Sequence, residues 1–261
     1  VRSQKNWEAE FDNIKYKNTI KIAQDDNIKD VSIYESIGTT RENLSNITDV
    51  YRCFNLSAYN QSAFENSYIN LIEGRFPENS DEIIISVDGL QVLETDEEPI
   101  NYLEKNLSFN INEETKKYTV VGLAEKLETD RKVLSTPFYI EVGAITYLDD
   151  KIINDDMTVN VTVITNNLHG IYDTVRNLAT EVGINQKEEI KLTEEEEILK
   201  TLGLLQGENN ETPCFFFNTP LLNYAGVLES GSDFAKTLYT IRSCCNTYCC
   251  NCINSCNIYV I

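Results

Sequence analysis

The sequence predicts an α+β fold in which a β-rich middle section is inserted between two outer sections that mix helices with strands. Between residues 67 and 150, apolar residues alternate with polar ones or form short β-branched runs, which is typical of strands. The longest helical spacings of apolar residues lie in the flanks, over residues 4–26, 171–182 and 193–207. A chain of 261 residues is also long enough to bury about 70–75% of its unfolded surface.

The first outer section is predicted as helix, strand, strand. Trp7, Phe11, Ile14, Ile20 and Ile22 share one apolar face, so residues 4–26 are expected to form a single amphipathic helix. Strands are predicted over residues 31–38 and 51–59, the second from its alternation of side chains. A short helix or turn over residues 60–66 then leads into the middle section.

The middle section begins with a strand over residues 68–72, an exposed turn from Gly74 to Ser80, and a β-branched strand over residues 82–87. A brief helix is expected at residues 88–93. Residues 107–111 and 117–123 form a predicted hairpin around a polar turn. One or two further strands are predicted over residues 133–147, around Pro137.

The last outer section is predicted as strand, helix, strand, helix. Residues 157–165 alternate as a strand, and residues 171–182 have helical spacing that ends at Gly183. A short strand is expected at residues 190–192, and a capping box at residues 193–196 starts a helix that continues to Gly207. Residues 215–217 and 221–228 are interpreted as core or membrane-proximal packing.

The formal net charge of −20 argues against a nucleic acid or an anionic lipid surface as partner, because the chain has no basic stripe to neutralise phosphates. We interpret the charge as a contribution to solubility. It also favours attraction of cationic peptides at long range, although a net charge does not locate a site.

Two motifs carry a resemblance to a known family. The first runs from Leu71 through Glu73-Gly74-Arg75-Phe76-Pro77 to Asp81-Glu82-Ile83-Ile84-Ile85-Ser86, and the second is Tyr118-Thr119-Val120-Val121-Gly122. In order and spacing they resemble the extracytoplasmic (MacB-like periplasmic core) domain of FtsX/MacB-like ABC transporter permeases. The likeness is dense over residues 68–125 and extends over about residues 1–240.

The resemblance implies a MacB-like ectodomain with a two-part α/β porter-like lobe, residues 1–66 and 151–240, and an inserted β-rich lobe, residues 67–150. Residues 241–261 would be a separate Cys-rich tail. It further implies a non-enzymatic domain, without cofactor or metal, that transmits ATP-driven motion from a cytoplasmic ABC ATPase subunit. A peptide, an antibiotic or a lipoprotein is the implied substrate, and the full-length protein would be anchored in the membrane.

The chain begins at Val1 and contains one Met, so we expect an excised or processed piece of a longer protein. Residues 1–13 are polar and unlike a signal peptide. No run of 18 apolar residues is present, so the membrane helices of the implied permease would lie outside this chain. The Asn-rich, Ala-poor composition suggests an AT-rich bacterial genome and a Gram-positive cell surface.

Six of the eight cysteines crowd into the tail, at positions 244, 245, 249, 250, 252 and 256, whereas Cys53 and Cys214 stand alone. The tail is interpreted in three ways: a disulfide knot, a metal knot, or a frameshifted transmembrane segment. Read one base later, codons for its Cys, Asn, Tyr and Ser residues give apolar residues over roughly 17 positions, close to the shortest membrane-spanning length. The coding DNA distinguishes these alternatives.

No catalytic residue is assigned from the sequence. His169 is the only His and is interpreted as a solvated or capping residue beside Gly170. The acidic clusters at residues 25–26, 149–150 and 194–197 lack the spacing of a calcium loop. Arg75 is expected either to pair with Glu82 across its turn or to be an ordinary surface Arg.

Two alternative functions remain from other classes. A secreted hydrolase that uses paired carboxylates would place two facing carboxylates with shifted pKa values in a pocket. A standalone surface adhesion module would have its termini far apart, whereas a permease ectodomain would have them side by side.

Overall fold

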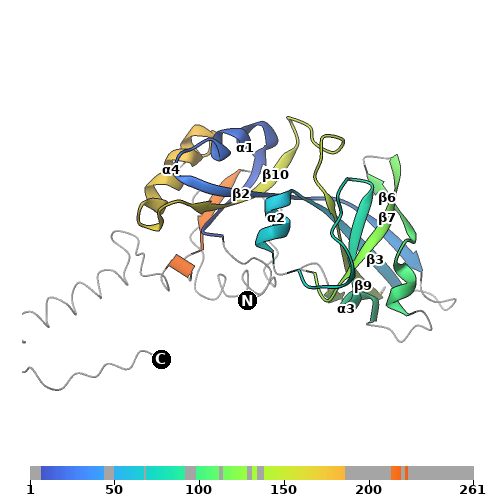
Figure 1. The fold of residues 1–261 in the computed structure, drawn as a ribbon. Coiled ribbons are helices and arrows are strands. Elements are labelled where there is room, and N and C mark those ends of the chain that lie inside the picture. Colours follow the sequence, from blue (N-terminus) through green and yellow to red (C-terminus); the bar gives the residue numbers. More distant parts are fainter. Residues whose placement is uncertain are drawn as a thin grey trace, which may run out of the picture. The chain divides into compact units, whose positions relative to one another are not determined.

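The computed structural model describes residues 7–43, 50–67, 69–91, 98–111, 114–127, 131–133, 138–185, 213–218 and 221–222. The chain divides into two compact units, residues 1–218 and 219–261. In the first unit the described strands form one eleven-stranded mixed sheet, with main order β11-β1-β10-β2-β3-β9-β5-β7-β4 (Figure 1). Strand β6 pairs with β2 and β7, and β8 pairs with β9. This mixture of a large sheet with a few helices confirms the predicted α+β class.

The described chain starts with strand β1 (Ala9–Lys15), which is followed by helix α1 (Tyr16–Ala23). The predicted helix over residues 4–26 is therefore wrong in its first half. A bulge between Phe11 and Ile14, where Asn13 has a φ of 55°, directs both apolar side chains into the core. Because of the bulge, β1 has a three-residue apolar spacing that imitates a helical turn.

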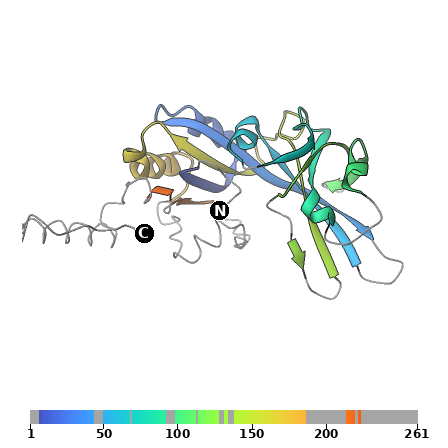
Figure 2. The same ribbon diagram turned by 60° about the horizontal axis from the view of Figure 1, so that its bottom comes forward.

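Strands β2 (Ile28–Asn43) and β3 (Val50–Tyr59) form a long antiparallel pair, and helix α2 (Gln61–Asn66) follows. The side chain of Asn60 caps α2 by accepting a hydrogen bond from the backbone N–H of Ala63 at 2.9 Å. These elements confirm the strands and the short helix predicted from the sequence. Figure 2 shows β2, in blue, running from the helix-covered part of the sheet into the β-rich part.

The β-rich section contains β4 (Leu71–Gly74), β5 (Glu82–Ser86), α3 (Val87–Gln91), the 3-10 turn η1 (Pro99–Tyr102), β6 (Asn106–Ile111), β7 (Glu114–Ala124), β8 (Arg131–Val133) and β9 (Phe138–Tyr147). The predicted hairpin is confirmed as the antiparallel pair β6–β7. The predicted strands over residues 133–147 correspond to β8 and β9. The strand predicted at residues 68–72 begins later, at Leu71.

The last described section contains β10 (Thr158–Thr165), the 3-10 turn η2 (Leu168–Gly170), α4 (Ile171–Glu181) and β11 (Cys214–Phe217). The predicted strand over residues 157–165 and helix over residues 171–182 are confirmed, and Gly183 follows the helix with a φ of 87°. The elements predicted at residues 190–192 and 193–207, and the Cys-rich tail, lie outside the described residues. Figure 1 shows α1 and α4 on the same side of the sheet.

The core of the β-rich section has two parts, on opposite faces of β5. Ile83 and Ile85 pack with Phe54, Leu123 and neighbouring apolar residues, whereas Ile84 packs with Phe64 and neighbours on the other face. All three isoleucines of β5 are fully buried. A strand covered on both faces needs a continuous apolar run, which explains the Ile83–Ile85 sequence.

Strands from every described section belong to the same sheet. The division into residues 1–66, 67–150, 151–240 and 241–261 stays a prediction.

Candidate functional site

The Arg75 turn, defined as residues 74–81, joins β4 to β5 and contains the central part of the first sequence motif. Both strands pair with β7, β4 in the antiparallel direction and β5 in the parallel direction. The backbone N–H of Arg75 donates to the carbonyl of Val121 on β7 at 3.0 Å. The second sequence motif therefore lies directly against the first.

Two glycines allow this close approach. Gly74 has a φ of 81°, and a Cβ at this position would lie 2.2 Å from the carbonyl oxygen of Val121. On the other side of the contact, a Cβ at Gly122 would lie 2.4 Å from the carbonyl oxygen of Arg75. Only glycine fits at both positions without moving backbone, so the two motifs form one contact between a turn and a strand.

Arg75 and Glu82 form a bidentate ion pair across the turn, as one of the two sequence interpretations expected. The guanidinium Nη1 and Nη2 atoms donate to Glu82 Oε2 and Oε1 at 2.7 Å and 2.6 Å. Nη1 also donates to the carbonyl of Phe76 at 3.0 Å, and the backbone N–H of Glu78 donates to Glu82 at 2.9 Å. The hydrogen bond from Arg75 is the main cause that lowers the pKa of Glu82.

The turn is also anchored at its other end, by the segment that follows β9. The backbone N–H of Ser80 donates to Asp149 Oδ2 at 3.0 Å, and Lys151 Nζ lies 2.6 Å from Asp81 Oδ2. Burial raises the pKa of Asp149, but hydrogen bonds from Ser80 and Lys151 outweigh burial and leave this pKa below its usual value. Phe76 packs on Phe64 of α2, with ring centroids 5.3 Å apart.

These contacts hold the turn in one shape. A carboxylate that is kept ionised by an Arg is a poor proton acceptor, so the Arg75–Glu82 pair is poorly suited to general acid–base chemistry. The pair fixes the path of the backbone between β4 and β5, and we treat it as a positioning element.

A second group of carboxylates lies on β1 and immediately before it, and was not singled out in the sequence. Glu8 is buried and accepts two hydrogen bonds from Thr165, from its backbone N–H at 2.8 Å and its hydroxyl at 2.6 Å. Glu10 is also buried and accepts a hydrogen bond from the hydroxyl of Tyr34 on β2. Acidic residues alternate at positions 8, 10 and 12, a spacing that places them on one face of a strand, but this segment was predicted as a helix, so the alternation was not used.

Glu35 of β2 lies close to this group. Its pKa is raised to about 7, chiefly by burial and in part by the charge of Asp12, while a backbone hydrogen bond from Ser36 opposes the shift. Asn160 of β10 donates to Glu35 Oε2 at 3.3 Å and accepts from the backbone N–H of Asn13 at 3.1 Å. Only the pairing of β1, β10 and β2 brings these residues together, so no local sequence pattern could predict the group.

The remaining candidates from the sequence are dispersed. His169 is exposed in η2, as interpreted, and the cap of this turn is the side chain of Asn167, which accepts from the backbone N–H of His169 at 3.1 Å. Cys53 is half-buried and Cys214 is buried. Among the described residues, no group of three or more His, Cys, Asp or Glu side chains is placed to hold a metal ion.

The first and last described segments of the first unit lie side by side. Strand β1 pairs with β11, so that Ala9 lies opposite Phe217. Beyond this pair, the backbone N–H of Asn218 donates to the carbonyl of Glu8 at 2.9 Å, and its side chain donates to the carbonyl of Trp7 at 2.9 Å. The described part of this unit therefore begins and ends at one edge of the sheet. No described helix is both long enough and apolar enough to cross a bilayer.

No protein-family model and no curated protein sequence matches the chain. Among solved structures, the chain is similar to the periplasmic region of MacB from Actinobacillus actinomycetemcomitans, at 11% identity and a TM-score of 0.45, over 87% of this chain and 96% of that one. It is similar to the extracellular domain of the noncanonic ABC-type transporter YknZ from Gram-positive bacteria, at 15% identity and a TM-score of 0.44, over 69% of this chain and 96% of that one. The chain is also similar to a domain of a putative permease protein from Porphyromonas gingivalis, at 11% identity and a TM-score of 0.43, over 77% of this chain and 96% of that one.

Proposed function

We propose that this chain is the extracytoplasmic domain of an FtsX/MacB-like ABC transporter permease. In this role it performs no catalysis. It receives motion that a cytoplasmic ATPase subunit generates and that membrane helices outside this chain transmit, and it uses the motion in the export or handling of a peptide, an antibiotic or a lipoprotein. It would face the outside of a bacterial membrane.

The observation that carries the proposal is the pairing of β1 with β11. A domain inserted between two membrane helices must begin and end close together, so that both ends reach the same membrane surface. The backbone and side-chain hydrogen bonds of Asn218 to residues 7 and 8 meet this requirement. A standalone adhesion module has no such requirement.

The two motifs give independent support. In the sequence they resemble the permease family, and in the fold they meet at Gly74 and Gly122, where a side chain would collide with backbone. Two of the residues that carry the resemblance, Gly74 and Gly122, are therefore glycines that this contact needs.

The test uses the complete gene product in bacterial cells, with a membrane-impermeant maleimide as the probe. Ser108 is exposed on β6, whereas Ser86 is fully buried at the end of β5. We expect Ser108→Cys to be labelled in intact cells above the level of the unsubstituted protein, and Ser86→Cys to stay at that level. An ATPase subunit is expected to co-purify with the membrane-extracted protein.

Two results would overturn the proposal. Labelling of Ser108→Cys only after the cells are permeabilised would place the chain in the cytoplasm. Purification of the complete gene product from the soluble fraction, without an ATPase, would show that it is not part of a transporter.

A further inference from the structure

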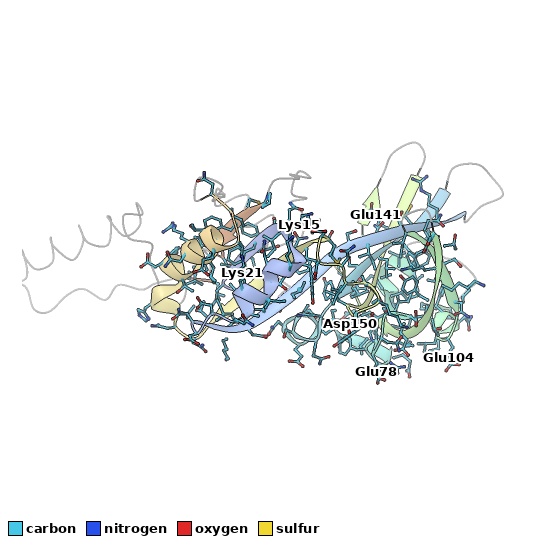
Figure 3. The ribbon with its side chains drawn as sticks, turned by 90° about the horizontal axis from the view of Figure 1, so that it is seen from above. Lys15, Lys21, Glu78, Glu104, Glu141 and Asp150 are labelled. Carbon is cyan, nitrogen blue, oxygen red and sulfur yellow. The ribbon has the colours of Figure 1, made fainter. Side chains whose placement is uncertain are left out.

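The segment that connects β9 to β10, residues 148–157, touches two parts of the chain that are far apart in sequence. One is the Arg75 turn and the other is the start of α1. In the view of Figure 3, Asp150 of this connecting segment lies between Lys15, at the start of α1, and Glu78 of the Arg75 turn.

The first half of the connecting segment holds the Arg75 turn through Asp149. One carboxylate oxygen of Asp149 accepts from the backbone N–H of Ser80 at 3.0 Å, and the other accepts from the backbone N–H of Lys151 at 2.9 Å. The same carboxylate therefore fixes the turn and its own segment. The ion pair from Lys151 to Asp81 is exposed and adds little, because solvent screens it.

The second half of the segment caps helix α1. The residue at the N-cap position, Lys15, makes no side-chain capping hydrogen bond. The first backbone N–H groups of the helix instead donate to carbonyls of the segment, Tyr16 to Met157 at 2.9 Å and Lys17 to Asp155 at 3.4 Å. These N–H groups have no partner inside a helix, so the segment completes the start of α1.

Each half of the segment is a turn closed by its own hydrogen bonds, and the second turn begins at the residue after the first one ends. The backbone N–H groups of Ile152 and Ile153 donate to the carbonyl of Asp149 at 2.9 Å and 3.0 Å. Further along, Asn154 accepts from the backbone N–H of Asp156 through its side chain and from that of Met157 through its carbonyl, both at 3.0 Å. Moving one end of the segment relative to the other would therefore strain two consecutive hydrogen-bonded turns.

We propose that the connecting segment couples the start of α1 to the Arg75 turn, so that a displacement of α1 changes the stability of the turn. The coupling follows from two hydrogen-bonded turns in direct succession, the first bonded to the Arg75 turn and the second to the start of α1. It holds whether or not the chain is a permease domain. If it is one, the coupling gives motion that arrives near β1 and α1 a route into the β-rich section.

The test removes one hydrogen bond at the start of α1 and reads the effect at the turn. Tyr16 is the first helical residue, where proline is tolerated, and Lys15 before it has the extended backbone, φ −65° and ψ 135°, that a following proline requires. Tyr16→Pro therefore removes the N–H that donates to Met157 and leaves the helix intact. Tyr16→Ala is the matched control, because it loses the same ring and keeps the N–H.

Amide hydrogen exchange of the full chain is the measurement. We expect the amides of Ser80 and Lys151 to exchange about three- to tenfold faster in Tyr16→Pro than in Tyr16→Ala, the effect of about one net hydrogen bond. Protection of Thr19 and later residues of α1 should be equal in the two variants. Equal exchange at Ser80 and Lys151 in the two variants, with α1 still protected, would overturn the coupling.

A second pair of variants tests the coupling from the other end and decides the matter if Tyr16→Pro does not fold. Asp149→Ala removes the carboxylate that binds Ser80, and Asp150→Ala removes an exposed carboxylate from the next residue. We expect faster exchange at the amides of Tyr16 and Lys17 in Asp149→Ala only. An effect of Asp149→Ala that stays within residues 79–82 would show that Asp149 only caps the turn. Neither result depends on an ATPase, so failure of the coupling is distinct from failure of the proposed function.

Discussion

Replacing Gly122 by Ala tests whether the contact between the two sequence motifs is as close as the structure shows. A Cβ at Gly122 would lie 2.4 Å from the carbonyl oxygen of Arg75 and 2.9 Å from Cγ2 of Ile84. Real Cβ atoms essentially never approach other atoms so closely. Something must therefore move, and the nearest atom belongs to the backbone.

The cost of Gly122→Ala depends on how easily the Arg75 carbonyl can shift. The backbone N–H of Arg75 donates a hydrogen bond to the carbonyl oxygen of Val121 at 3.0 Å, and the Arg75 guanidinium donates two hydrogen bonds to the carboxylate of Glu82. Both contacts restrict movement of the Arg75 backbone. The second neighbour, Ile84, is fully buried in the part of the core that contains Phe64. Overpacking of a core costs about 1–3 kcal/mol, and since backbone must move here we expect a loss of about 2–4 kcal/mol. For a domain of this size, such a loss lowers Tm by roughly 4–16 °C.

Urea unfolding followed by circular dichroism measures the loss, with Gly170→Ala as the control. At Gly170 the nearest atom to an added Cβ is Thr174 Oγ1, at 4.0 Å, so there is no collision. Since Gly170 is the N-cap of α4, a loss of only about 0.5 kcal/mol is expected there. If Gly122→Ala unfolds within about 0.5 kcal/mol of Gly170→Ala, the turn is not packed against β7 as described, and the reasoning fails.

Three further predictions follow from single residues. The pKa of Glu35 is raised to about 7, so the folded state binds this proton more tightly than the unfolded state, and the resulting stabilisation is lost as pH rises from about 4.5 to 7. Between pH 4 and pH 8, the free energy of unfolding of Glu35→Gln should therefore rise by about 1–2 kcal/mol relative to that of the wild type, after allowance for solvent screening. A difference between the two proteins that does not change with pH would contradict this. The pKa of Glu82 is lowered by Arg75, so the ionised carboxylate stabilises the fold above the unfolded pKa, and this stabilisation is lost as pH falls through the folded pKa. In urea unfolding, Glu82→Gln should be slightly less stable than the wild type at pH 7 and equally stable at pH 3. An equal loss of stability at both pH values would rule out the ion pair as the cause. Phe109 is fully buried with its ring edge-on to Tyr118 at 5.5 Å, so Phe109→Ala should cost about 3–5 kcal/mol in thermal or urea unfolding, and a loss below about 1 kcal/mol would place the side chain outside the core.

Much of the β-rich section and the Arg75 turn could be predicted because their signals are local. The hairpin β6–β7 has its polar turn between two alternating strands, and α4 has helical spacing that ends at a glycine. The ion pair between Arg75 and Glu82 was expected because the two residues flank one short turn. In each case the residues that interact lie within a few positions of one another.

The two places where the sequence misled or was silent depend on long-range pairing. Strand β1 was predicted as a helix, because its bulge gives apolar residues at positions 11 and 14, and only hydrogen bonds to β10 and β11 make it a strand. The raised pKa of Glu35 depends on Asp12 of β1 as well as on burial, and these residues meet only when three strands align. A pattern within a short window contains no information on either.

By itself the sequence determined the α+β class, the order of strand and helix in the middle section, and a net charge of −20, which argues against a nucleic acid as partner. The tertiary structure decided that the first and last described strands of the main unit are adjacent, and that residues 148–157 contact both α1 and the Arg75 turn. The physical reason is range. Side-chain periodicity and turn chemistry act over a few residues, whereas a β-sheet hydrogen-bonds segments that lie 150 or more positions apart, and those pairings exist only after the whole core has formed.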